Sequence, residues 1–328
     1  MIVVTGAAGF IGSNVLAEFE AEGRGPLAAV DWMETGEKWR NLAKRRIAAF
    51  VHPDQLLPWL DAHAGEVRLI VHMGAISATT ESDVDRLVRL NINYTVSLWD
   101  WCTHHRVPFI YASSAATYGG IESRCVDDDS VAALSSLQPL NAYGWSKKAT
   151  DIIFAERRDR GEPTPPQWIG LKFFNVYGPN EYHKGDMMSV AAKMFDMVMR
   201  GDPVRLFKSY RPDIADGEQR RDFVYVKDCT RTISWLIDHP DVSGIFNVGS
   251  GKAQSFLEIV TALQLATNRP IDVEFIDMPE SLRGRYQYFT EADMAKAAGF
   301  GIDTSFRDLN LGVQDYVVNY LTRGDRFR

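Results

Sequence analysis

The chain has 328 residues, of which 45% are hydrophobic and 24% are charged, and its formal net charge is −7. This length and balance predict a globular protein with a large core and two lobes rather than one. The negative charge argues against a nucleic acid or an anionic membrane as a partner, although a pocket for an anion can still be locally basic.

The three cysteines form no CxxC pair and no cluster with histidine at zinc-ligand spacing. We therefore expect no metal site and a reducing compartment. Met1 leads directly into an apolar strand without the charged and apolar regions of a signal peptide, and no apolar run reaches the ~18 residues of a membrane span. We expect a cytoplasmic protein.

The N-terminal half alternates apolar, β-branched runs with helical patterns, which is typical of βαβ units and a parallel sheet buried on both faces. The predicted strands cover 2–6, 27–31, 68–75, 107–114 and 168–178. The predicted helices cover 10–22, 54–64, 83–105 and 143–159.

After residue 174 the alternation loosens. The predicted helices there cover 187–200, 228–238, 255–267 and 306–322, and the predicted strands cover 204–207, 221–226, 244–249 and 271–276. Two polar stretches, 122–130 and 210–220, predict surface loops. Because no linker separates the lobes, we expect them to exchange segments. One lobe takes 1–173, 225–251 and 286–301, and the other takes 174–224, 252–285 and 302–328.

The stretch TGAAGFIGS places Gly6, Gly9 and Gly12 between the first strand and the first helix. Glycines permit a tight turn there and let backbone amides approach a pyrophosphate, to which the helix N-terminus adds partial positive charge. An acid, Asp31, ends the second strand, where the dinucleotide fingerprint requires one. The sequence therefore predicts an α/β fold, with a Rossmann-type doubly wound parallel sheet for a dinucleotide and a smaller α/β lobe for the substrate.

Asp31 alone favours NAD, because its carboxylate would repel a 2′-phosphate. Five cations follow closely, however, and Lys38 is placed to neutralise such a phosphate. From the residues alone, NAD and NADP both remain open.

Tyr143 and Lys147 are four residues apart in NAYGWSKK, so they share one face of a helix. A nearby ammonium favours the phenolate and lowers the pKa of a phenol from about 10, which suits proton transfer near neutral pH. An isolated YxxxK is more often a surface pair. The motifs that precede this one indicate a catalytic pair instead.

With GxxGxxG and ASSAATYGG (112–120), this YxxxK resembles the pattern of the extended short-chain dehydrogenase/reductase family. The resemblance implies that Tyr143 is an acid/base at a carbinol, that Lys147 holds the nicotinamide ribose, and that Ser114 hydrogen-bonds the reacting oxygen.

Further strings, among them FNVYGPNEYHKGDMMS (174–189) and RRDFVYVKD (220–228), resemble the ADP-heptose 6-epimerases of that family over nearly the whole chain. This resemblance implies hydride transfer to NADP, a transient 6″-ketone and return of the hydride to the other face. Lys184, in the HKG of the first string, would be the acid/base opposite Tyr143. From the residues alone, a lysine in such a Gly-flanked loop is more often phosphate-binding or solvated.

The same resemblance implies the remaining site residues, and we also expect a homo-oligomer. The implied cofactor contacts, besides the glycines, are Phe10, Ile11, Asp31, Trp32, Lys38, Met73, Gly74, Ala75, Ile76, Ser77, Asn91, Tyr143, Lys147, Val176 and Lys184. The implied substrate contacts are Ser114, Asn175, Asp186, Lys193, Phe207, Lys208, Ser209, Tyr210, Arg221 and Tyr286.

The sequence departs from the family pattern at four positions. Asp186 stands where the family has serine, Lys193 where it has histidine, Trp32 where it has asparagine, and Pro53 where it has lysine. These changes leave the redox residues intact. They also leave open that the substrate is a different nucleotide-activated heptose or hexose. The alternatives are a sister nucleotide-sugar epimerase, dehydratase or reductase, and a non-enzymatic NAD(P)-sensing scaffold, against which the intact Tyr and Lys argue.

Overall fold

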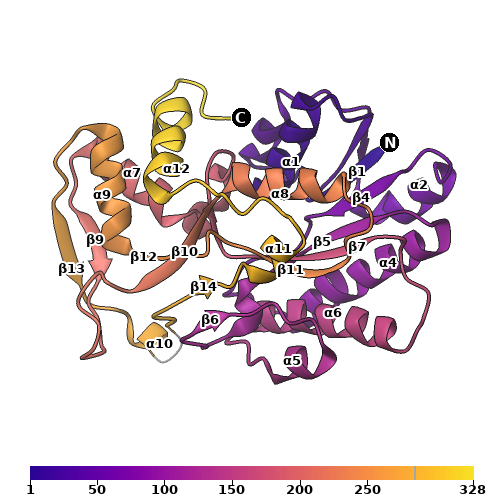
Figure 1. The fold of residues 1–328 in the computed structure, drawn as a ribbon. Helices are drawn as coiled ribbons and strands as arrows, with labels where there is room; N and C mark the ends of the chain where they lie inside the picture. The colour runs from indigo at the N-terminus through magenta and orange to yellow at the C-terminus, as the bar shows by residue number, and fades with distance from the viewer. Residues whose placement is uncertain (284–285) are drawn as a thin grey trace.

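A seven-stranded parallel sheet forms the centre of the larger lobe in the computed structural model, which describes residues 1–283 and 286–328 (Figure 1). Its strands are β1 (Ile2–Thr5), β2 (Leu27–Val30), β3 (Ala49–Val51), β4 (Leu69–His72), β5 (Phe109–Ser114), β7 (Trp168–Phe173) and β11 (Gly244–Val248). They lie in the order β11-β7-β5-β4-β1-β2-β3. The order reverses between β1 and β4, which is the switch point where doubly wound sheets bind ligands.

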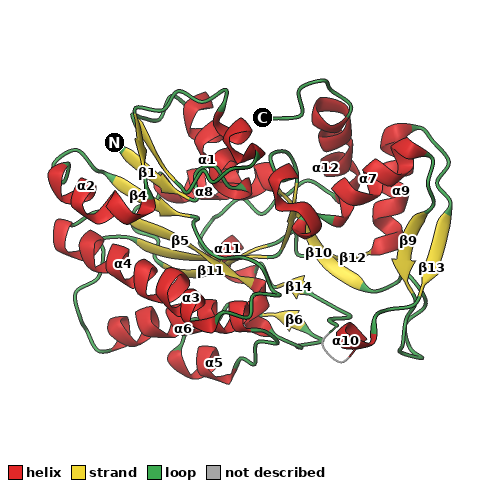
Figure 2. Ribbon diagram, turned by 180° about the vertical axis from the view of Figure 1, so that it is seen from behind, coloured by secondary structure: helices red, strands yellow, loops and turns green. Residues whose placement is uncertain are grey.

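Helices cover both faces of this sheet (Figure 2). They are α1 (Phe10–Ala21), α2 (Leu56–Ala62), α4 (Tyr94–His105), α6 (Ala142–Asp159) and α8 (Val226–Ile237). Because side chains alternate along a strand, Val3 enters the core shared with α2, α4 and α6, while Val4 enters the core shared with α1 and α8. The predicted parallel sheet with two buried faces is confirmed.

The predicted helix over 83–105 is present but is not a regular α-helix. A π-helical turn over Val88–Asn93 joins α3 (Val84–Leu87) to α4. Such turns are frequent at functional sites, and this one carries Asn91, whose side chain is completely buried.

The smaller lobe lies beside the carboxyl edge of the large sheet and contains two small sheets with helices packed on them (Figure 1). Its strands are β8 (Asn175–Tyr177), β9 (Val204–Phe207), β10 (Arg220–Tyr225), β12 (Ala253–Ser255) and β13 (Val273–Ile276). Its helices are α7 (Val190–Arg200), α9 (Phe256–Thr267) and α12 (Leu309–Tyr316), the last continued by a π-helical turn over Val317–Leu321. These elements share one apolar core that includes Phe195, Leu263 and Tyr316.

The predicted strand over 168–178 is two strands in different sheets. β7 belongs to the large sheet and β8 to the three-stranded sheet β12-β10-β8. The break falls at Phe174, whose amide donates to Val248 and whose carbonyl accepts from Val176. The apolar run continues through the break, so its pattern gave no sign that the chain crosses between lobes here.

The stretch 122–130 is not only the surface loop that its polar composition predicted. It contains β6 (Arg124–Cys125), which pairs in parallel with β14 (Glu291–Ala292). Asp127 is buried and accepts the backbone N–H of Asn247 at 2.8 Å. Other short elements that the sequence did not predict are β3, β12, α5 (Val131–Ser136), α10 (Glu280–Arg283) and α11 (Ala295–Gly299).

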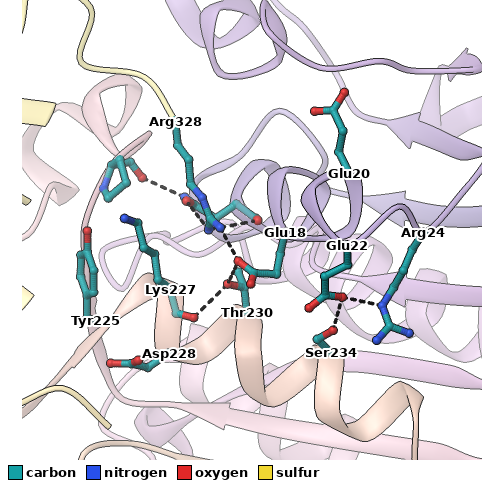
Figure 3. Close-up of polar contacts among 12 residues, drawn as sticks. Glu18, Glu20, Glu22, Arg24, Tyr225, Lys227, Asp228, Thr230, Ser234 and Arg328 are labelled. Carbon is teal, nitrogen blue, oxygen red and sulfur yellow. Dashed lines mark hydrogen bonds and ion pairs between the residues drawn. The ribbon is translucent and has the colours of Figure 1, made fainter. Parts of the chain in front are cut away.

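Polar contacts fix α1 to α8 and to the last residue of the chain (Figure 3). The Thr230 hydroxyl donates to Glu18 at 3.1 Å, and the Ser234 hydroxyl donates to Glu22. The Arg328 guanidinium donates to Glu18 as well. These contacts hold the helix whose N-terminus follows the glycine loop.

Three further features bear on the class of protein. The three cysteine thiols are free and buried. Over 1–283 and 286–328, no helix combines the length and apolar character that crossing a bilayer requires. Over the same ranges, no group of three or more His, Cys, Asp and Glu side chains is arranged to hold a metal ion.

Candidate active site

A cleft of about 640 Å³ lies at the carboxyl ends of β1, β4 and β5. It is lined by these residues predicted from the sequence: Gly6, Gly9, Phe10, Ile11, Gly12, Asp31, Trp32, Lys38, Met73, Gly74, Ala75, Ile76, Ser77, Ser114, Tyr143, Lys147, Val176 and Lys184. The predicted residues that do not line it are Asn91, Asn175, Asp186, Lys193, Phe207, Lys208, Ser209, Tyr210, Arg221 and Tyr286.

The glycine loop leaves no room for a side chain at Gly6 or at Gly12. Gly6 has a φ of +61°, and a Cβ there would lie 2.6 Å from the backbone nitrogen of Gly74. A Cβ on Gly12 would lie 2.1 Å from the carbonyl oxygen of Gly6. No side chain caps the start of α1, so its first amides are available to an anion in the cleft.

Asp31 is held on both of its carboxylate oxygens where β2 ends. One accepts the backbone N–H of Ala8 at 2.8 Å, and the other accepts the Lys38 ammonium at 2.6 Å. Lys38 also donates to the Trp32 carbonyl at 3.1 Å. A second cavity of about 1230 Å³ shares Asp31, Trp32 and Pro53 with the cleft. The dinucleotide fingerprint places the adenosine in this direction.

Asn91 lies behind the cleft and fixes the loop that follows β4. Its carboxamide oxygen accepts the Ile76 amide at 2.9 Å, and its nitrogen donates to the Ile76 carbonyl at 3.0 Å. The same nitrogen donates to the Ser146 hydroxyl of α6 at 3.0 Å. Asn91 therefore joins the loop to the helix that carries Tyr143 and Lys147.

Ser114, Tyr143 and Lys147 meet on one wall of the cleft. Ser114 ends β5, and α6 begins next to it, with the Asn141 side chain accepting the Gly144 amide at 2.8 Å. Burial raises the pKa of the Tyr143 phenol, and the nearby Ser114 hydroxyl opposes this rise.

The expected lowering of the Tyr143 pKa by Lys147 is wrong for the protein alone. Burial dominates both groups, and it lowers the pKa of Lys147 to about 8. Lys147 is 2% exposed, and among the described residues its ammonium has no hydrogen-bond partner. A buried ammonium that faces a cleft without an acceptor fits the hydroxyls of a cofactor ribose.

Lys184 comes from a different wall, a 3-10 turn over Tyr182–Met187 that precedes α7. Its ammonium lies 5.3 Å over the Phe10 ring of the glycine loop, and burial lowers its pKa. Gly185 next to it has a φ of +53°, which only a residue without a side chain adopts easily. This turn brings Lys184 against the start of α1.

His183 lines the cleft and was not predicted as a site residue. Its Nδ1 lies 3.2 Å from the carboxamide nitrogen of Asn41, which is a donor, so Nδ1 accepts and a neutral ring carries its proton on Nε2. Burial first, and Lys38 second, lower the pKa of His183 to about 4. The HKG string already contains this histidine, and that is the signal that could have indicated it.

Arg221, Tyr286 and Phe207 form a separate cluster in the smaller lobe. The Arg221 guanidinium lies 5.2 Å from the Tyr286 ring and 5.8 Å from the Phe256 ring, and Phe207 meets Tyr286 edge to face at 6.2 Å. Arg221 is 8% exposed, and within the described part of the chain no carboxylate pairs with it. A buried guanidinium without a counter-ion favours an anionic ligand.

Four of the other predicted substrate residues, Lys208, Tyr210, Lys193 and Ser209, already have partners within the chain. Lys208 pairs with Asp277 at 3.1 Å, and the Tyr210 hydroxyl donates to the same carboxylate at 3.3 Å. Lys193 donates to the backbone carbonyl of Asp186 at 3.0 Å and does not pair with its carboxylate. The Ser209 amide donates to Asp216 and Asn175 is exposed on β8.

Comparison with known proteins gives one consistent result. The sequence pattern of the NAD dependent epimerase/dehydratase family matches residues 2–249. The chain is 46% identical over 335 residues to an ADP-L-glycero-D-manno-heptose-6-epimerase of Nitratidesulfovibrio vulgaris, with 100% of both chains covered. It is 43% identical over 335 residues to the enzyme of that name from Fusobacterium nucleatum, again with 100% of both covered. The crystal structure of Helicobacter pylori ADP-L-glycero-D-manno-heptose-6-epimerase is 26% identical, with a TM-score of 0.80 over 97% of this chain and 95% of that one.

Proposed function

The chain belongs to the NAD-dependent epimerase/dehydratase family, and on this basis we propose that it inverts C6″ of ADP-D-glycero-D-manno-heptose to give the L-glycero epimer. One observation carries the proposal. Ser114, Tyr143 and Lys147 line one wall of the cleft while Lys184 lines another, in a chain that matches curated 6-epimerases over its full length.

We propose NADP as the cofactor, because Lys38 compensates the Asp31 carboxylate that would otherwise repel a 2′-phosphate. The uncapped start of α1 suits the pyrophosphate, and the Lys147 ammonium suits the nicotinamide ribose. The bound cofactor would supply the hydride chemistry, as acceptor and then as donor for the sugar carbon.

The chain's own residues supply the acid/base chemistry and the orientation. Ser114 holds the reacting oxygen beside Tyr143. The ionised form of Tyr143, which the raised pKa makes the minor form in the free protein, takes the proton of the sugar hydroxyl as the carbonyl forms. Lys184, on the other wall, gives a proton to the same oxygen once the sugar has turned and the carbonyl is reduced. Burial lowers the pKa of Lys184, which brings an ammonium closer to the range where it releases a proton at neutral pH.

We propose that the smaller lobe, with the boundaries predicted from the sequence, binds the ADP end of the substrate. Arg221 is the principal residue of this proposal, since its buried guanidinium lacks a carboxylate partner within the described residues and its fork can bind two oxygens of a diphosphate. The aromatic rings of Phe207 and Tyr286 next to it offer a surface for the base.

The test is to incubate the purified protein with ADP-D-glycero-D-manno-heptose and follow C6″ by NMR. We expect inversion without added cofactor consumption, because an epimerase recycles its hydride. Absence of inversion with cofactor bound would exclude this substrate, and a panel of nucleotide sugars would then identify a sister activity. Net consumption of added NADPH would indicate a reductase. The homo-oligomer stays a prediction, which light scattering tests.

A further inference from the structure

A fully buried ion pair lies directly behind the Ser114 wall of the cleft. The Lys172 ammonium of β7 is 2.8 Å from the Asp151 carboxylate of α6, and the two side chains are 1% and 0% exposed. Neither residue lines the cleft, and the proposed chemistry uses neither. Burying two charges is costly unless their geometry and remaining hydrogen bonds are well satisfied, so the contacts around the pair indicate what it does.

Asp151 binds two residues of β5, Tyr111 and Ser113, and Ser113 itself lines the cleft. One carboxylate oxygen accepts the Tyr111 hydroxyl at 2.9 Å, and the other accepts the Ser113 hydroxyl at 2.7 Å as well as Lys172. Ser113 is the residue immediately before Ser114, so Asp151 fixes the strand on the N-terminal side of the reacting serine.

Lys172 fixes the other side of the same serine. Its ammonium donates to the Thr117 hydroxyl at 2.7 Å, and that hydroxyl donates to the Ser114 carbonyl at 2.8 Å. The Lys172 ammonium also lies 5.1 Å over the Tyr118 ring. The backbone of Ser114 is thus held between two groups that both belong to the ion pair.

Asp151 also belongs to the helix that carries the other reacting groups. Tyr143, Lys147 and Asp151 follow one another at intervals of four residues on α6, and residues so spaced share one helix face. A rotation or slide of α6 would therefore move all three together, and the bonds of Asp151 to β5 and β7 oppose such a motion.

We propose that Asp151 and Lys172 are positioning residues that hold Ser114 in register with Tyr143 and Lys147, so that turnover depends on a pair that does not reach the cleft. The proposal rests on the proposed function, since it takes those three residues as the reacting groups. It adds to that function a structural determinant located behind the site.

The charge of Asp151 acts on the site as well. It raises the pKa of Lys147, against the effect of burial, and it raises the pKa of Tyr143. Both effects keep the phenol and the ammonium protonated in the free protein. The other titratable or charged groups on elements packed against this wall include His72 on β4, Tyr94 on α4, Tyr111 on β5, Tyr118 beside α6, Lys172 on β7, and the exposed Asp85, Arg86 and Arg89 at the start of the helix over 84–105.

The direct test is an NMR titration of Lys147 that requires no substrate. Protein labelled with [13Cε]lysine, with the Lys147 signal assigned through Lys147→Arg, gives the pKa of this ammonium in the wild type and in Asp151→Asn. We expect the pKa of Lys147 in the variant to lie below that of the wild type, because an opposing charge near the ammonium is lost. This measurement stays valid whether or not the protein acts on ADP-heptose, so it separates failure of the inference from failure of the proposed function.

The kinetic test compares variants on the sugar substrate that the protein turns over. Thr117→Val leaves both charges in place and removes only the link from Lys172 to the Ser114 carbonyl. We expect kcat to fall about tenfold or more, as for a misplaced reacting group, with KM within about twofold. Lys172→Arg should retain more of kcat than Lys172→Met, since the guanidinium keeps the charge and its hydrogen bonds.

Asp228→Asn is the matched control. Asp228 is another buried carboxylate, and it pairs with Arg307 and Arg231 away from the cleft. The Asp228→Asn variant should have a lower melting temperature, with the pKa of Lys147 and kcat near the wild-type values. If Asp151→Asn does not fold, the double variant Asp151→Asn with Lys172→Met removes both charges together and is measured in the same way.

Two results would overturn the proposal. The first is an unchanged Lys147 pKa in a folded Asp151 variant. The second is a Thr117→Val protein with the kcat of the wild type, because the pair would then contribute to stability alone.

Discussion

The Lys38 ammonium lies 2.6 Å from the Asp31 carboxylate at the end of β2. Both side chains are largely withdrawn from water, with exposed fractions of 20% and 6%. The acid that would mark an NAD-binding protein therefore has its charge compensated from within the chain. This pair is the basis for preferring NADP.

Removing the cation should reverse the cofactor preference. We expect Lys38→Met to weaken NADP binding about 10- to 100-fold while NAD binding changes little, because one charge-assisted contact to the 2′-phosphate is lost and the Asp31 charge is exposed. Titration calorimetry with each cofactor measures the ratio. Arg40→Met is the control, since Arg40 pairs with Glu37 at the surface and should not change either affinity. Equal losses for NAD and NADP would show that Lys38 does not contact the 2′ group.

Loss of the Tyr143 hydroxyl should stop turnover while leaving the cofactor bound. We expect Tyr143→Phe to lower kcat by about 10²- to 10⁴-fold, the usual contribution of a positioned acid/base. The measurement is the rate of C6″ inversion by NMR, together with the cofactor content of the purified variant. Trp145→Phe is the matched control, because Trp145 is on the same helix but is 42% exposed. Inversion at a wild-type rate in Tyr143→Phe would remove this residue from the mechanism.

Cofactor affinity should fall at high pH. Burial lowers the pKa of Lys147 to about 8, so the free protein carries an ammonium below this pH and a neutral amine above it. We expect the dissociation constant of the cofactor to rise as the pH increases through about 8, since only the ammonium binds the ribose strongly. Fluorescence titrations between pH 6 and 10 test this. In Lys147→Met the affinity should be lower and should lose this pH dependence, whereas a wild type with constant affinity would contradict the assignment.

Stability should fall as the medium becomes acidic because of His72. His72 is buried between Thr5, 2.6 Å from its Nδ1, and Thr95, 3.0 Å from its Nε2, and its pKa is lowered to about 3. The unfolded chain takes up a proton below about pH 6.5 and the folded one does not. The stability from neutral His72 is therefore complete above pH 6.5 and is lost as the pH falls toward 3.

Urea unfolding of the wild type and of His72→Gln at pH 8 and pH 5 isolates this contribution. The difference in the free energy of unfolding between the two proteins should shrink by about 2 kcal/mol at the lower pH. The comparison cancels other titrating groups, such as Asp222, whose pKa is raised to about 6. A difference that stays constant with pH would mean that His72 titrates normally.

Replacing the buried Arg221 guanidinium of the smaller lobe should weaken binding of the substrate and leave binding of the cofactor unchanged. We expect Arg221→Met to raise KM for the nucleotide sugar about 10- to 100-fold, because a charge-assisted bidentate contact is lost, with the cofactor dissociation constant unchanged. Steady-state kinetics and calorimetry together separate the two effects. Arg220→Met serves as the control, since the Arg220 side chain is 45% exposed and pairs with Glu218. Weaker cofactor binding with an unchanged KM would mean that Arg221 contacts the cofactor and not the substrate.

Much of the larger lobe could be predicted because its signals are local. Apolar β-branched runs indicated β1, β2, β4, β5 and β7, and glycines at fixed intervals indicated the turn before α1. The helix that carries Tyr143 and Lys147 was predicted to within one residue at its start. β6 and β14 were missed because each has two residues and is defined only by its pairing with the other.

In the candidate site, too, the residues that could not be predicted are those whose position depends on distant parts of the chain. Lys184 and His183 reach the cleft through a turn next to Gly185, and nothing in their sequence neighbourhood fixes which wall they join. Lys172 and Asp151 were not singled out, because a lysine in an apolar strand and an aspartate late in a helix do not indicate a common partner.

The sequence by itself determined the main alternation of strands and helices in the larger lobe, the glycine turn, and the placement of Tyr143 and Lys147 on one helix face, since these follow from patterns over a few residues. Only the tertiary structure decided which charges leave water. Burial, not the neighbouring cation, sets the pKa of Tyr143, and a lysine from β7 compensates Asp151 on α6. The physical reason is that the free energy of a charge depends on everything packed around it, and most of those groups are distant in the chain.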